Sequence, residues 1–172
     1  GTVVNLHGGE LLTSIQTGAI DALEWVGPYN DLAFGMHKAG KYYYYPGWHE
    51  PGGVLDCFIN LEKWNSLPKD LQKIVETSAT ATTQRITNEM IVGNNQALEI
   101  LIKEHKVKLK PFPDNVLKEL FVLSDKVMKK LISSDPLSKE VYNSIINFRN
   151  LSIKRSEVTE LKFLEARSKF LI

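Results

Sequence analysis

The sequence predicts an α/β fold that ends in long helices, and two patterns support this fold class. Up to about residue 60, short apolar runs alternate with turns containing Gly and Pro, which is typical of short buried strands. From about residue 66 onward, apolar residues recur at the spacing of helices almost without interruption. The 172 residues are enough for one domain with a core of its own.

Short elements are expected in the first part of the chain. A helix is expected before Gly18, because Leu11 and Ile15 recur at helical spacing and Gly18 suits a helix C-terminus. The apolar runs on either side favour strands, and Gly27 and Pro28 mark a turn. In order, we expect a strand at 2–6, a helix that begins within 7–10, a strand at 19–26, a turn at 27–31, a short helix at 32–38 and a strand at 54–60.

Long helices are expected in the second part. Ser66 suits an N-cap and Pro68 a first helical turn, so a helix is predicted from there to about His105. Gly93 is a candidate position for a kink in it. The other expected elements are a short strand at 107–109, a helix at 115–132 and a helix from 135 to about 170. A last helix of ~30 residues would be ~45 Å long, so its apolar stripe needs a cover from a second subunit, another part of the protein or its own domain.

Charge argues against one class of partner. The net charge of +1 argues against nucleic acid, because phosphate binding needs a concentrated basic face. The apolar runs are far too short to cross a bilayer. Residues 1–37 contain no Lys or Arg and four of the 20 acidic residues, so the rest of the chain holds 21 basic against 16 acidic side chains.

The single cysteine cannot form an internal disulfide. Cys57 lies within the apolar run 54–59, and this setting predicts a small buried hydrophobic residue.

Three residues are candidates for a binding site. Glu24 lies among apolar neighbours at the end of an expected buried strand, where a carboxylate is costly unless it is paired. A cation would offset this cost, with the backbone carbonyl of Trp25 as a second oxygen ligand; solvent or a distant Arg would also do so. Trp25 suits the wall of a small-molecule pocket or the core, and Glu50 lies in a rigid turn before an expected strand.

Motifs for catalysis are scarce. None of the four histidines lies at metal-ligand spacing with another His or Cys, which argues against a zinc site. His49 and Glu50 could form an acid–base pair, but neighbours on an extended chain point in opposite directions. The glycine pairs match neither a phosphate loop nor a dinucleotide fingerprint.

Taken together, several strings resemble one family. They follow one another in the order found in the DctP-type TRAP substrate-binding proteins, and they are most similar to the branch that binds 2-oxo acids with sodium. The strings are residues 8–10, 18–31 (GAIDALEWVGPYND), 41–48, 49–52 and 64–68.

The resemblance implies a fold of two α/β lobes hinged around a cleft, like other periplasmic binding proteins. At about half the family's length, the chain is expected to form the C-terminal half. Residues 1–23 would end one lobe, 24–62 would supply strands of the other, and 63–172 would form a long bridging helix and the C-terminal helices.

The resemblance also implies a site and a function. Glu24 and the carbonyl of Trp25 would bind Na⁺, or alternatively Ca²⁺, while the Trp25 side chain and Glu50 would contact the substrate. The protein would be a periplasmic receptor, not an enzyme, that delivers a small organic acid such as pyruvate to a TRAP membrane permease. A homodimer through the C-terminal helices is expected. Two alternatives remain: a ligand-sensing domain of a signalling system, and an acid–base enzyme using Glu24, Glu50 and His49.

Overall fold

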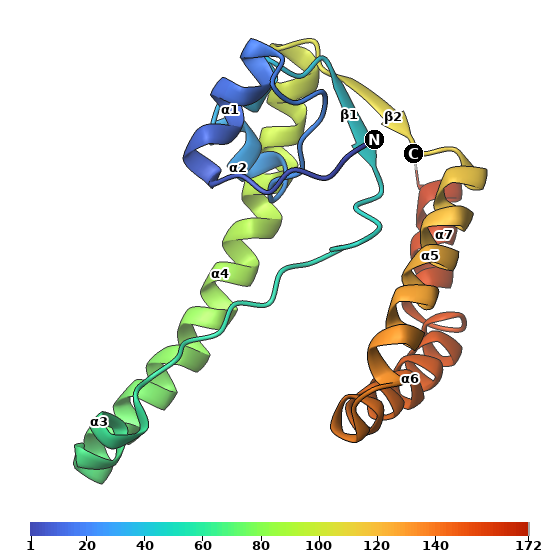
Figure 1. Cartoon of the computed structure of the whole chain (residues 1–172). Coiled ribbons are helices and arrows are strands. Elements are labelled where there is room, and N and C mark those ends of the chain that lie inside the picture. Colours follow the sequence, from blue (N-terminus) through green and yellow to red (C-terminus); the bar gives the residue numbers. More distant parts are fainter. Residues whose placement is uncertain (172) are drawn as a thin grey trace. The chain divides into compact units, whose positions relative to one another are not determined.

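The computed structural model describes residues 1–171, which fall into two compact units, residues 1–112 and the residues from Pro113 onward. The elements of the first unit are α1 (Gly8–Thr17), α2 (Pro28–Ala33), a 3-10 turn η1 (Met36–Lys38), β1 (Tyr42–Tyr45), α3 (Leu61–Ser66), α4 (Lys69–Lys103) and β2 (Lys108–Pro111) (Figure 1).

The first unit is built around the C-terminal part of α4. Helix α2 packs across α4, and the buried apolar residues of the described chain gather here: Met36, Ala97, Leu101 and Val107. Helix α4 was predicted over nearly the same residues and is confirmed. Ser66 is not its cap, however, because it ends α3 and its hydroxyl donates to the Lys63 carbonyl at 2.8 Å.

Gly93 serves close packing instead of a kink. Helix α4 runs unbroken through it, and a Cβ added there would lie 2.9 Å from Cγ of Tyr29 on α2. Beside it, the side-chain oxygen of Asn94 accepts a hydrogen bond from the Tyr29 backbone N–H at 2.9 Å. This N–H is one of the donors that a helix start leaves without an intrahelical partner, so α4 both seats and caps α2.

One parallel pair of strands closes the first unit. Tyr42 pairs with Lys108 and Tyr45 with Pro111, so β1 and β2 run side by side over four residues. The Tyr44 ring contacts Phe112 just beyond β2, with centroids 5.2 Å apart. The predicted strand at 107–109 is thereby confirmed, although it begins one residue later and ends two residues later.

The second unit contains three helices, α5 (Asp114–Ile132), α6 (Pro136–Ser156) and α7 (Glu160–Phe170), in which α6 contacts both of the others. The side chain of Asp135 accepts from the N–H groups of Leu137 and Ser138 and so caps α6, as a residue before an N1 proline should. The prediction of one helix from 135 to 170 was wrong. The chain turns at 157–159, where the Val158 N–H donates to the Arg155 carbonyl.

Three predicted strands are absent from the described residues, at 2–6, 19–26 and 54–60. A strand exists only where a neighbour satisfies its backbone groups, and no described segment pairs with these runs. Val54 and Phe58 are 85% and 91% exposed, and Cys57, predicted to be buried, is exposed as well. The assignment of residues to lobes stays a prediction.

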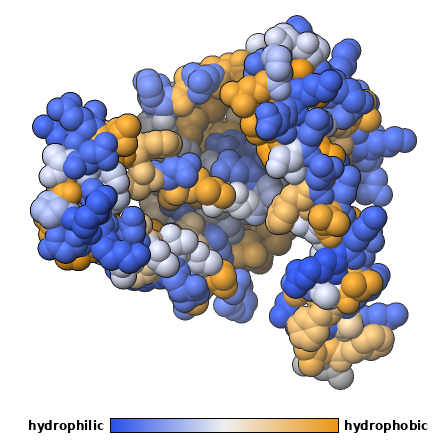
Figure 2. Space-filling view, turned by 90° about the horizontal axis from the view of Figure 1, so that it is seen from below, coloured by the Kyte–Doolittle hydropathy of each residue, from blue (hydrophilic) through white to orange (hydrophobic). Residues whose placement is uncertain are grey.

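The chain leaves much of its apolar surface uncovered, and Figure 2 shows hydrophobic residues spread over the face in view. The described surface is 14451 Å², whereas a folded monomer of 19.5 kDa exposes about 8,500 Å² by the usual scaling. Two separate bodies of the units' sizes would still expose only about 10,000 Å². No helix within residues 1–171 is long and apolar enough to span a membrane.

Candidate functional site

The predicted cation ligands lie in the loop between α1 and α2. Gly18 ends α1 in the left-handed conformation, with φ of 75°, and turns the chain into this loop. Glu24 and Trp25 follow in irregular structure, and Pro28 at the first position of α2 ends it. The expected strand at 19–26 is thus replaced by a loop whose backbone carbonyls are not used in a ladder.

Trp25 is held from two sides. Its ring lies 4.9 Å from that of Phe34, and on the other side it covers Gly8 so closely that a Cβ there would lie 2.7 Å from Cη2. The indole Nε1 is buried and has no acceptor among the described residues. An unpaired buried donor costs about 1–3 kcal/mol, so this nitrogen is a place where a bound acceptor would be stabilising.

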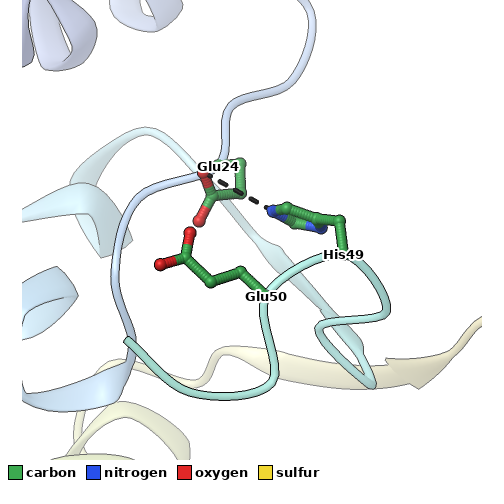
Figure 3. A group of neighbouring side chains, drawn as sticks. All are labelled: Glu24, His49 and Glu50. Carbon is green, nitrogen blue, oxygen red and sulfur yellow. Dashed lines mark ion pairs between the residues drawn. The ribbon is translucent and has the colours of Figure 1, made fainter. Parts of the chain in front are cut away.

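Glu24 meets two residues from a distant part of the chain. Figure 3 shows the Glu24 and Glu50 carboxylates pointing toward one another, with the His49 ring directed at Glu24. The Nε2 atom of His49 lies 3.7 Å from Oε2 of Glu24, and ligand atoms of all three residues lie within 4.8 Å of one another. Within residues 1–171 this is the one group of three such side chains with the geometry of a metal site.

The prediction that Glu24 is buried was wrong, because its side chain is 57% exposed. Solvent can therefore stabilise this carboxylate, and burial gives no argument for a cation. The argument that remains is convergence. Two carboxylates held this close repel one another, and a cation between them would offset the repulsion.

His49 was expected beside Glu24 and Glu50 only in the acid–base alternative, and not as part of the cation site. The expectation that His49 and Glu50 point in opposite directions assumed an extended chain, but residues 48 and 49 form a bend and 51–52 another. In a bend, neighbouring side chains can converge. The flanking Pro46–Gly47 and Gly52–Gly53 dipeptides are turn signals and could have indicated it.

Comparison with known proteins identifies the family. The family described as bacterial extracellular solute-binding protein, family 7 (DctP), matches residues 1–135. The chain belongs to the DctP family. This confirms the resemblance seen in the sequence, on the strength of more than half of the chain.

Named relatives of this DctP chain include a periplasmic binding protein and solved structures. The chain is 37% identical over 158 residues to the monocarboxylate 2-oxoacid-binding periplasmic protein of Nostoc sp.. This alignment covers 92% of the present chain and 43% of the relative. A TRAP periplasmic solute-binding protein from Colwellia psychrerythraea, solved with bound calcium and pyruvate, is 33% identical with a TM-score of 0.90. The matched region covers 94% of the present chain and 49% of the Colwellia protein.

Two further solved structures differ in their ligands. A TRAP periplasmic solute-binding protein from Pseudoalteromonas atlantica, with bound sodium and pyruvate, is 30% identical with a TM-score of 0.88 over 95% of this chain and 50% of its own. One from Bordetella bronchiseptica, a mixed-occupancy dimer with calcium and picolinate, is 27% identical with a TM-score of 0.85 over 94% of this chain and 48% of its own.

The DctP chain thus spans about half the length of the relatives that it matches. Within that half the fold class is confirmed, since the chain follows TRAP periplasmic binding proteins along nearly all of its length.

Proposed function

We propose that this DctP-family protein is the periplasmic receptor of a TRAP transporter, and that it binds a small organic acid together with a cation and delivers the acid to a membrane permease. The observation that carries the proposal is the convergence of Glu24 and Glu50, from two separate segments, beside the loop that contains Trp25. Relatives of the same fold were solved with pyruvate and calcium or with pyruvate and sodium. A 2-oxo acid such as pyruvate is therefore the proposed ligand.

The roles follow from the chemistry of each group. Sodium and calcium prefer oxygen ligands, so the Glu24 carboxylate and the Trp25 backbone carbonyl are proposed to hold the cation, Na⁺ or alternatively Ca²⁺. Glu50 and the Trp25 indole are proposed to contact the organic acid. No chemical step is needed, and the relatives are described as solute-binding proteins and not as enzymes.

The cation would also solve a charge problem. An organic anion needs a positive group, and residues 1–37 contain no Lys or Arg. A cation beside Glu24 would supply positive charge next to the two carboxylates of the group. The relatives are about twice as long as this chain, and we propose that the counterpart of their other half supplies the remaining ligands and covers the exposed apolar surface.

Calorimetry tests the proposal. The full-length protein is titrated with pyruvate with and without sodium or calcium, and Glu24→Gln, which keeps the shape but removes the charge, is expected to abolish the cation dependence. Glu10→Gln is the matched control, because Glu10 lies exposed on α1, outside the group of three. Pyruvate binding that is equally strong in Glu24→Gln would refute the cation site.

We also propose that a second copy of the protein covers the C-terminal helices. Phe148 and Leu151 on α6 are 73% and 68% exposed, and the Bordetella bronchiseptica relative is described as a dimer. Light scattering of the full-length protein should give twice the mass of one chain, and Phe148→Ser with Leu151→Ser should halve it. A monomeric wild-type protein at all concentrations would contradict this.

A further inference from the structure

Asp31 is a buried charge that the proposed binding roles do not use. It lies in the first turn of α2 and is only 7% exposed, unlike nearly all other acidic residues of the described chain. A buried carboxylate is costly unless hydrogen bonds compensate it. Its bonding partners therefore indicate what it is for.

The two oxygens of Asp31 bind two different segments. Oδ1 accepts from the backbone N–H groups of Val26 and Gly27, at 3.4 and 3.3 Å, and so closes the loop that carries Glu24 and Trp25. Oδ2 accepts from the hydroxyl of Tyr43 on β1. Strand β1 leads directly into the turn that carries His49 and Glu50.

The Tyr43 hydroxyl is committed to this bond. Burial first, and the hydrogen bond to Asp31 second, raise the pKa of the Tyr43 phenol above its ordinary value. The hydroxyl therefore keeps its proton and remains a donor. Helix α2 is also held against α4 by Asn94 and by the close contact of Tyr29 with Gly93. The position of Asp31, which lies on α2, is therefore fixed relative to α4.

We propose that the Asp31–Tyr43 pair is the positioning device of the site, which holds the Glu24–Trp25 loop and the His49–Glu50 turn at the spacing that a cation requires. The inference rests on the proposed function for its consequence, but its geometry is independent of it. Residues that orient metal ligands without touching the metal typically change metal affinity about 10–100-fold when replaced. Asp31 and Tyr43 are here positioning residues and not ligands.

Terbium(III), a luminescent substitute for calcium, gives the first readout in the full-length protein. Tyr43→Phe removes one hydroxyl from a ring that stays in place, and it is expected to weaken terbium binding at least about tenfold. Tyr44→Phe is the matched control, since Tyr44 lies next in β1 and is 52% exposed. It should leave both the affinity within twofold and the urea midpoint unchanged. Tyr43→Phe takes one hydrogen bond from the buried Asp31 carboxylate, so its urea midpoint should fall, and its terbium affinity is measured without urea, where the variant is folded.

Hydrogen exchange gives the second readout, which needs no ligand. In Tyr43→Phe, amides in both 24–27 and 47–50 are expected to exchange faster, with a much larger change than in the amides of α4. Asp31→Asn keeps an acceptor oxygen and is expected to retain slow exchange in part, whereas Asp31→Ala should lose it.

The two readouts separate the two ideas. Absence of terbium binding to the wild-type protein would refute the cation site, and exchange would still decide the positioning role. If Tyr43→Phe binds terbium as the wild type does, or if only one of the two segments exchanges faster, the pair does not join the two segments and the inference is wrong.

Discussion

Replacing Gly93 by Ala has two opposite effects on stability, a gain from the higher helix propensity of alanine and a loss from a steric clash with Tyr29. In an exposed helix interior, Gly→Ala stabilises by about 1 kcal/mol, because alanine restricts the unfolded backbone. At Gly93, however, the new Cβ would lie 2.9 Å from Cγ and 3.1 Å from both Cδ atoms of Tyr29. Rotation of the ring about the Cβ–Cγ bond leaves Cγ in place, so the clash is relieved only by another χ1 rotamer of Tyr29 or by a shift of α2.

Overpacking of this kind costs typically about 1–3 kcal/mol. The steric cost should exceed the helix gain, so we expect Gly93→Ala to destabilise the first unit by about 1 kcal/mol in total. All three tryptophans, Trp25, Trp48 and Trp64, belong to residues 1–112. Urea unfolding followed by tryptophan fluorescence therefore reports on this unit, with an expected fall in the midpoint of roughly 0.5–1 M.

Gly9→Ala is the matched control. Gly9 is also helical, but nothing lies within 4 Å of its would-be Cβ, so its replacement should raise the midpoint. A second control repeats Gly93→Ala in a Tyr29→Ala protein, where the substitution should become stabilising. If Gly93→Ala alone raises the midpoint as Gly9→Ala does, the steric argument fails, and with it the view that α4 seats α2 through this contact.

Three further predictions concern titration. Burial, followed by the neighbouring charges of His105 and Lys38, lowers the pKa of His37 below its ordinary value of about 6.5. The unfolded chain then binds the proton more tightly than the folded chain, so the stability that is present above pH 6.5 should be lost as the pH falls below it. Urea midpoints at pH 8 and pH 5 should differ in the wild type and differ less in His37→Gln. Because the phenol pKa of Tyr43 is raised, absorbance titration of the tyrosines should show one that ionises last, and this late step should be missing in Tyr43→Phe but present in Tyr42→Phe. Hydrogen bonds from Ser138 and Leu137 lower the pKa of Asp135, so helix content should fall when the pH drops below about 3.8. Asp135→Ala should show this lower helix content already at neutral pH, whereas Asp125→Ala should not. Equal helix content in the wild type and Asp135→Ala would refute the cap.

The helices could be predicted because their signals are local. The spacing of apolar residues, Pro68, Pro136 and the Asp135 cap all act within a few residues of the helix that they define. The break at 157–159 escaped prediction, since Glu157 and Val158 are no worse for a helix than their neighbours. Helix starts were therefore easier to find than an internal turn.

The strands could not be predicted in the same way. The run 54–60 has the composition of a buried strand, but pairing depends on another segment that the local sequence does not name. The burial of Glu24 failed for a related reason, because apolar neighbours such as Leu23 and Trp25 pack in their own directions and leave the carboxylate in solvent. Its meeting with Glu50 could be expected from the family resemblance but not from spacing.

Cys57 has a practical consequence. It is the single cysteine of the 172 residues, and its sulfur is free and exposed on the segment that leads from the His49–Glu50 turn to α3. A maleimide dye would therefore attach at one defined atom without any engineering of the chain. Because Cys57 lies seven residues after Glu50, the fluorescence of such a dye would report ligand binding that orders the His49–Glu50 turn.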